Sequence, residues 1–398
     1  MRQPRKRLHR TWVYHARASG PAAAALNNID CIEPGPAARC LNDGARTMTA
    51  ENDDSPARSR KASIDDVAKA AGVAIKTVSR VLNNEPNVRD ETRARVMVAV
   101  KRLNYHPSPS ARSLASRRSY LIGLVYDNPS GNYTIEVQRG ALARCREGKF
   151  LLLLHEVTGS GEELTQDVMA FANQTHIDGL ILAPPLSESV EIIRALDEHG
   201  LPFARIAPND MKHRSPYSDM DDEGAAREMT EYLIGLGHRR IAFIIGRHGH
   251  YASGQRLKGY KAALKAHRIP FNQDYVRQGD FLFDSGLQAA RQLLALPSRP
   301  TAIFAANDDM AAGTLMAAHE MGIAVPGQLS VAGFDDAAIS RTVWPPLTTI
   351  SQPTYELSYS AADLLLKSLL SGNAPKSTRL PHKLISRAST GVLRNPGD

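Results

Sequence analysis

The sequence predicts an all-α head, a short hinge helix and a two-lobed α/β core of doubly wound parallel sheets. Between Ser63 and Asn104, apolar residues recur at helical spacing in three short stretches. Beyond Tyr120, short apolar runs alternate with amphipathic stretches, which is typical of parallel strands covered by helices. This second part has about 280 residues, more than one such sheet normally needs, so we expect two lobes.

The first two predicted helices are joined by a single glycine. Ser63 followed by Asp66 is the pattern of a capping box, so the first helix starts after Ser63. Gly72 ends it, because glycine adopts the left-handed backbone that a tight turn needs. The second helix runs from about Ile75 to Leu82, with Val78, Val81 and Leu82 facing inward. Two short helices around one glycine predict a helix-turn-helix.

The outer face of the second helix carries the groups that read base edges in a major groove. Lys76 and Arg80 favour guanine, and Ile75 favours a thymine methyl, so we expect these three to read bases. Thr77, Ser79 and Asn83 are expected to contact the DNA backbone. An ordinary helix pair with a polar outer face would also fit this pattern. Charge favours DNA binding, because residues 61–119 hold 12 Lys or Arg against 5 Asp or Glu.

A hinge segment, residues 107–119, follows the head with the sequence PSPSARSLASRRS. Its middle could form two turns of helix, in which Leu114 is an isolated large apolar residue. We expect Leu114 to wedge between base pairs in the minor groove, with Ala111 and Arg112 beside it. One helix-turn-helix has a small footprint, so pairing of two copies is expected to supply a second half-site.

Polar residues follow three of the predicted core strands. LIGLVY runs into Asp127 and Asn128, TAIFAA into Asn307, Asp308 and Asp309, and LSVAG into Phe334, Asp335 and Asp336. Single residues of this kind often only cap the next helix. Because ligands of doubly wound folds lie beyond the carboxyl ends of strands, the three together suggest a polyol site.

Several motifs resemble the lac repressor (LacI/GalR) family of ligand-controlled transcription regulators. They are VAKAAGVAIKTVSRVLN, LNYHPSPSARSLASRRSYLIGLV, AANDDMAAG, LSVAGFDD and WPPLTTISQP. The resemblance implies a homodimeric repressor that binds operator DNA through its head and hinge helix. It also implies a periplasmic-binding-protein-like core that binds a small effector, commonly a sugar. The head departs from the family in having Ala74 and Arg89 where serine is usual, although Asp90 is well placed to cap the third helix instead.

The resemblance also implies which residues hold the effector. Arg256, Asn307 and Asp335 match the family positions, Phe281 lies where an aromatic ring often covers the ligand, and Gln352 lies at the lobe crossover. Our candidates in the first lobe are Asp127, Asn128, Tyr133 and Ser187.

The expected domain bounds follow from these motifs. The head spans 61–106, the hinge 107–119, the first lobe 120–220 with 351–375, the second lobe 221–350, and a C-terminal segment 376–398. Residues 1–60 fit no element, and we expect translation to start at Met48; a disordered basic arm is the alternative. We expect a cytoplasmic protein without a membrane span, cofactor or metal site.

Other function classes fit the sequence less well, and to different degrees. An enzyme would need a phosphate loop or a nucleophile elbow, and no GxGxxG, GxxxxGK[ST] or GxSxG occurs. A sugar-binding protein without a regulatory role would share the core but lack the basic head. An activator, or a regulator that responds to a purine or nucleoside, is the nearer alternative.

Overall fold

The computed structural model describes residues 62–82, 85–105, 118–159, 161–209, 215–373 and 375–393. The expectations for Met48, for Asn83 and for the hinge residues Ala111, Arg112 and Leu114 lie outside these residues. The chain divides into residues 1–61 and residues 62–398, and all described helices and strands belong to the second unit.

The head consists of helices α1 (Ile64–Ala71), α2 (Ile75–Leu82) and α3 (Asp90–Arg102). The predicted capping box is confirmed, because Ser63 Oγ accepts from the Asp66 N–H at 3.3 Å and Asp66 Oδ2 accepts from the Ser63 N–H at 2.8 Å. Gly72 ends α1 with φ 64°, as expected. The helix-turn-helix is therefore encoded locally at both ends of its first helix.

A small apolar core holds the three head helices together. Its buried residues are Val67, Ala68, Ala71, Val78, Val81, Val96, Ala99 and Tyr105. The expectation that Asp90 caps α3 is wrong, since Arg89 occupies the N-cap and makes no side-chain capping bond. Asp90 is instead the first helical residue, where its negative charge favours the positive end of the helix dipole. The Arg93 guanidinium donates to the Glu85 carbonyl at 2.7 Å, which links α3 to the segment that follows α2.

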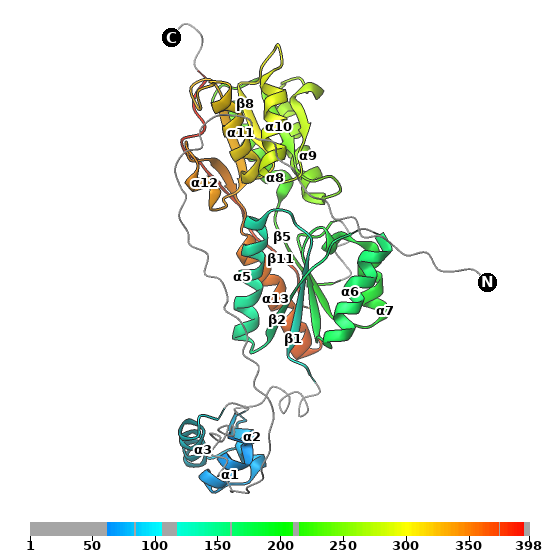
Figure 1. The fold of residues 1–398 in the computed structure, drawn as a ribbon, viewed down its shortest axis with the longest axis vertical. Coiled ribbons are helices and arrows are strands. Elements are labelled where there is room, and N and C mark those ends of the chain that lie inside the picture. Colours follow the sequence, from blue (N-terminus) through cyan, green and yellow to red (C-terminus); the bar gives the residue numbers. More distant parts are fainter. Residues whose placement is uncertain are drawn as a thin grey trace, which may run out of the picture. The chain divides into compact units, whose positions relative to one another are not determined.

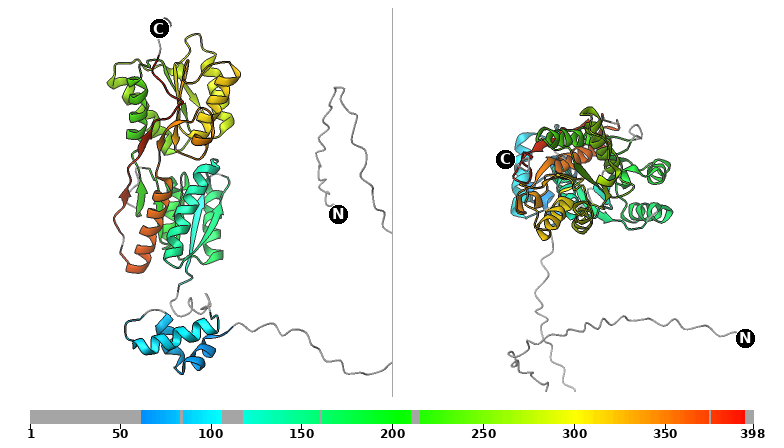
Figure 2. Two further views of the ribbon diagram at one scale, coloured as in Figure 1. Left: turned by 90° about the vertical axis from the view of Figure 1, so that its left-hand side faces the viewer. Right: turned by 90° about the horizontal axis from the view of Figure 1, so that it is seen from above.

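The first lobe contains a six-stranded sheet in the order β11-β5-β4-β3-β1-β2. Its strands are β1 (Leu121–Tyr126), β2 (Leu151–Glu156), β3 (Gly179–Leu182), β4 (Phe203–Ile206), β5 (Tyr217–Asp219) and β11 (Thr378–Arg379). All their pairings are parallel. Its helices are α5 (Gly131–Glu147), α6 (Gly161–Thr175), η1 (Leu186–Glu188), α7 (Val190–Glu198) and α13 (Thr354–Ser371). In Figures 1 and 2, α13 lies beside α5, whereas α6 and α7 belong to a separate apolar cluster.

The second lobe repeats this design, with the strand order β12-β10-β9-β8-β6-β7. Its strands are β6 (Ile241–Ile245), β7 (Val276–Gln278), β8 (Ala302–Ala305), β9 (Ser330–Asp335), β10 (Thr348–Ser351) and β12 (Lys383–Ile385). Only the β10–β12 pairing is antiparallel among the described strands. Its helices are α8 (Asp222–Gly235), α9 (Tyr251–Ala266), η3 (Gln273–Tyr275), α10 (Phe283–Leu294), α11 (Asp308–Glu320) and α12 (Ile339–Thr342).

The chain passes between the lobes at three places. It leaves the first lobe between β5 and α8, returns between β10 and α13, and crosses once more between β11 and β12. The predicted strands LIGLVY, TAIFAA and LSVAG correspond to strands β1, β8 and β9. In the described part of the chain, no helix combines the length and apolar character needed to cross a membrane.

Candidate functional site

The exposed face of α2 presents the residues predicted to read bases. Ile75, Lys76 and Arg80 are exposed, with 47% of Ile75 accessible, whereas Thr77 and Ser79 are half-buried. An exposed isoleucine on a helix whose Val78 and Val81 faces are buried is available for an apolar contact in a groove. Arg80 pairs with Glu85 at 3.5 Å, so this contact must open before the guanidinium can reach a base.

A cavity lies between the two lobes at the carboxyl ends of their strands. It contains about 430 Å³ of atom-free space, part of it open to solvent. Its lining residues are Asn128, Ser130, Tyr133, Pro184, Ala207, Asp222, His250, Ala252, Arg256, Phe281, Asn307, Asp335 and Gln352. The cavity therefore draws on both lobes and on the crossover at Gln352.

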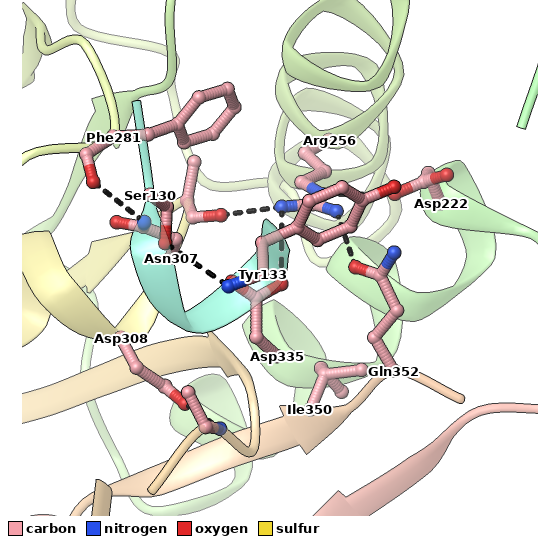
Figure 3. Close-up of polar contacts among 12 residues, drawn as sticks. Ser130, Tyr133, Asp222, Arg256, Phe281, Asn307, Asp308, Asp335, Ile350 and Gln352 are labelled. Atoms are coloured by element: carbon pink, nitrogen blue, oxygen red, sulfur yellow. Dashed lines mark hydrogen bonds and ion pairs between the residues drawn. The ribbon is translucent and has the colours of Figure 1, made fainter. Parts of the chain in front are cut away.

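Arg256 is the centre of the polar network in this cavity (Figure 3). Its Nε donates to Asp222 at 2.9 Å, Nη2 donates to the Gln352 side-chain oxygen at 2.9 Å, and Nη1 donates to the Ala306 carbonyl at 2.6 Å. The guanidinium carbon lies 3.5 Å from the centre of the Phe334 ring. These contacts leave guanidinium N–H groups able to donate to a ligand, because five donors are available.

Two carboxyl groups flank Arg256 in a desolvated setting. Asp335 lies 3.9 Å from Nη1, and burial, opposed by Arg256, raises the pKa of Asp335 to about 7. Burial likewise raises the pKa of Asp222, although the Arg256 guanidinium opposes it. At neutral pH the Asp335 carboxyl group is therefore close to half protonated and can either accept or donate a hydrogen bond, which suits ligand hydroxyl groups.

Asn307 and Phe281 form the second-lobe wall of the cavity. The Asn307 side chain accepts from the Met310 N–H at 3.0 Å, which caps α11, and donates to the Phe281 carbonyl at 2.8 Å. Phe281 and Asp335 have φ values of 73° and 111°, which L residues rarely adopt. Strained backbone conformations of this kind are common at binding sites, where they hold side chains in a required direction. Both residues line the cavity.

Direct contacts join the lobes at the rim of the cavity. Asp309 accepts from Ser130 Oγ and from Asn132 Nδ2, both at 2.8 Å. Arg247 donates to Asp127 at 3.0 Å. The two hydrogen bonds to Asp309 hold the start of α5 against the first turn of α11.

Glu188 adds a further link between the lobes, because its carboxylate accepts from the Tyr251 N–H at 3.1 Å. Burial, partly offset by this hydrogen bond, raises the pKa of Glu188 to about 7. The carboxylate lies at the first turn of α9, where a negative charge favours the helix dipole.

Seven of the nine residues expected to hold an effector line the cavity, and two do not. Asp127 points to Arg247, and Ser187 is fully buried, with its carbonyl 3.5 Å from the Arg205 guanidinium. Sequence reasoning did not find Ser130, Pro184, Ala207, Asp222, His250 and Ala252. Asp222 carried a weak signal, since it belongs to an acidic run that starts a helix. No cluster of potential metal ligands occurs among the described residues.

Comparison with known proteins identifies the family of this chain. Residues 63–108 match the family described as bacterial regulatory proteins, lacI family, and residues 230–390 match the periplasmic binding protein-like domain. The catabolite control protein A of Priestia megaterium is 33% identical over 333 residues, which cover 82% of this chain and 98% of that protein. The chain belongs to the LacI family.

Other LacI-family relatives agree. The ribose operon repressor of Escherichia coli K12 is 34% identical over 77% of this chain and 92% of its own length. The lac repressor dimer bound to operator and the anti-inducer ONPF is 30% identical, with a TM-score of 0.71 over 83% of this chain and 100% of that chain. A complex of the regulator CelR with cellobiose is 30% identical, with a TM-score of 0.64 over 82% of this chain and 99% of its own. This LacI-family chain is thus a DNA-binding transcriptional regulator and not an enzyme.

Proposed function

We propose that this protein is a cytoplasmic homodimeric repressor whose operator binding is controlled by a small sugar in the interlobe cavity. The observation that carries the proposal is the cavity itself, where Arg256, Asp222, Asp335 and Gln352 offer donors and acceptors beside the Phe281 ring. Sugar hydroxyl groups need hydrogen-bond donors and acceptors on the protein, and the apolar face of a sugar ring packs well against an aromatic side chain. We place the protein in the cytoplasm because it acts on DNA.

Exposed apolar residues support pairing through the first lobe. Ile135 and Leu142 on α5 are 54% and 48% exposed, and Leu151 and Leu154 on the edge strand β2 are 61% and 48% exposed. The two elements contact each other. An edge strand with exposed leucines is unfavourable in a monomer, so we propose that this surface of α5 and β2 contacts the second subunit.

The rim contacts suggest how the cavity could influence the DNA-binding head. Ser130 and Asn132 lie at the start of α5, and both are held by Asp309 of the second lobe. Because α5 carries the proposed dimer surface, a ligand that changes the lobe contacts would change the pose of the two first lobes. That pose would decide whether the two hinge segments form helices on DNA. By linkage, a ligand that weakens operator binding binds the DNA-free form more tightly by the same factor.

The test starts from an operator selected by the full-length protein from random duplexes. Mono- and disaccharides, and purines and nucleosides as a second panel, are then screened by thermal shift and by release of labelled operator. We expect a sugar to raise the melting temperature and release the operator. Arg256→Lys should bind operator normally and lose the response, whereas Lys258→Ala on the exposed side of α9 should keep it. A response only to purines, or a normal response of Arg256→Lys, would contradict the proposal.

A further inference from the structure

His250 carries a polar atom that the fold does not use. It occupies the N-cap of α9 but makes no side-chain capping bond. His250 is 6% exposed and lines the cavity, and its ring meets the Phe281 ring edge to face, with 5.4 Å between the centroids. Its Nε2 has no hydrogen-bond partner among the described residues. Buried polar atoms without partners are rare, so this atom is available to a ligand in the cavity.

The imidazole of His250 is uncharged at physiological pH. Burial, reinforced by the nearby Arg247, lowers the pKa of His250 to about 4. Arg256 acts in the same direction and Asp127 opposes it. In the neutral ring, Nε2 is either a donor or an acceptor, depending on the tautomer. A hydroxyl group can partner either form, whereas a carboxylate or phosphate oxygen can only accept.

Within the part of the chain that the structure describes, the cavity also lacks a free positive charge for an anionic ligand. Arg256 is the only Lys or Arg among the residues that line it, and Asp222 and Asp335 both lie within 4 Å of its guanidinium nitrogens. At the rim, Arg247 already pairs with Asp127 at 3.0 Å. An acidic ligand would bring its charge beside the carboxyl groups of Asp222 and Asp335, and no described residue of the cavity offers a free cation to offset it.

We propose that the effector is an uncharged polyhydroxylated molecule that hydrogen-bonds Nε2 of His250, and that this cavity rejects uronates and sugar phosphates. The inference rests on the proposed function, because it concerns the ligand of the same cavity. It adds a specificity-determining residue and the charge class of the ligand.

Matched ligands test the charge class on the full-length protein. Isothermal titration compares glucose with glucuronate and glucose 6-phosphate, galactose with galacturonate, and ribose with ribose 5-phosphate. We expect at least one neutral sugar to bind, and its acidic partners to bind at least about tenfold more weakly. Tighter binding of an acidic partner would overturn the inference while leaving the proposed function intact. Failure of all sugars to bind, with operator binding retained, would overturn the proposed function as well.

Variants of His250 test the contact with the neutral sugar that binds. His250→Leu should weaken binding at least about fivefold, since it leaves a ligand hydroxyl without a partner. His250→Gln, which restores an uncharged donor and acceptor, should stay within about threefold of wild type. His248→Ala, at an exposed position of the same loop, should bind as wild type.

Two further readouts keep the test independent of folding. All variants should bind operator as wild type, and ¹⁵N NMR should show the Nε2 resonance of His250 shifting when the sugar is added. Unchanged affinity in His250→Leu, or an Nε2 resonance unaffected by saturating sugar, would remove His250 from the site.

Discussion

Replacing Arg256 by methionine should destabilise the core in a strongly pH-dependent way. The Arg256 side chain is 5% exposed, and its partners Asp222 and Asp335 are 12% and 13% exposed. Removing one partner of a buried ion pair typically costs about 3–5 kcal/mol, because the remaining charge is buried without compensation. Arg256→Met leaves the buried carboxyl groups of Asp222 and Asp335 without their guanidinium partner. It also removes the hydrogen bonds that Arg256 donates to the Ala306 carbonyl and the Gln352 side-chain oxygen.

The sign of the pH dependence follows from the carboxyl groups. Burial already raises the pKa of Asp335 to about 7 while Arg256 opposes the rise, so loss of the guanidinium raises it further. A carboxyl with a raised folded-state pKa contributes stability at low pH that is lost as the pH rises through that pKa. Below that range the carboxyl groups are neutral and tolerate burial. We therefore expect a loss of about 3–5 kcal/mol at pH 8.5 and a loss smaller by more than about 1.4 kcal/mol at pH 5.5.

Urea unfolding followed by circular dichroism at pH 5.5, 7 and 8.5 measures these differences. Arg256→Met/Asp222→Asn should recover part of the loss at pH 8.5, because one of the two unpaired carboxylates is removed. Arg291→Met is the matched control, since Arg291 pairs with Glu320 on the surface of the same lobe, at side-chain exposures of 50% and 39%. It should cost at most about 1 kcal/mol at every pH. An equal loss for Arg256→Met at pH 5.5 and 8.5 would refute the electrostatic argument.

Three other outcomes are expected. Lys76→Ala should relax base preference at one operator position, measured by selection from random duplexes, and an unchanged preference would exclude direct readout by Lys76. Leu114→Ala should lose specific binding but keep the salt-sensitive nonspecific kind, which titrations at two salt concentrations resolve; equal losses would count against a wedge. Burial raises the pKa of Glu188 to about 7, so the difference in unfolding free energy between wild type and Glu188→Gln should fall from pH 5.5 to pH 8.5. Urea unfolding measures this difference, and an increase with pH would contradict burial as the cause of the raised pKa.

Elements with strong local signals could be predicted from the sequence. The capping pair Ser63 and Asp66 and the turn at Gly72 act within a few residues, so they fix α1 without tertiary information. The long apolar strands were equally clear. Strands β5, β7 and β10 were not, because these short strands include polar residues such as Thr348 and Ser351. Their strand geometry comes from pairing with neighbours, which the local sequence does not encode.

Cavity residues that follow a strand could be predicted from the sequence pattern, and Arg256, Phe281 and Gln352 followed from the family resemblance. Residues at the starts of two helices were missed. Asp127 and Asn128 are adjacent, but successive side chains at a strand end point to different sides, and only Asn128 faces the cavity. Asp222 and His250 start α8 and α9, where acidic and polar residues commonly cap helices. Their place in the cavity depends on how the second lobe packs against the first, so no local pattern distinguishes them from ordinary caps.

The polar strand ends combine two roles that the sequence presents as alternatives. Asn307 caps α11 through its side-chain oxygen and lines the cavity, and two residues later Asp309 joins the first lobe through Ser130 and Asn132. The start of α11 therefore connects helix, cavity and lobe contact within three residues. A ligand that draws hydrogen bonds from Asn307 would act directly on the turn that holds α5. Because α5 also carries the surface that we propose for dimerisation, a local change in hydrogen bonding at the cavity would reach that surface without a long chain of intermediate contacts.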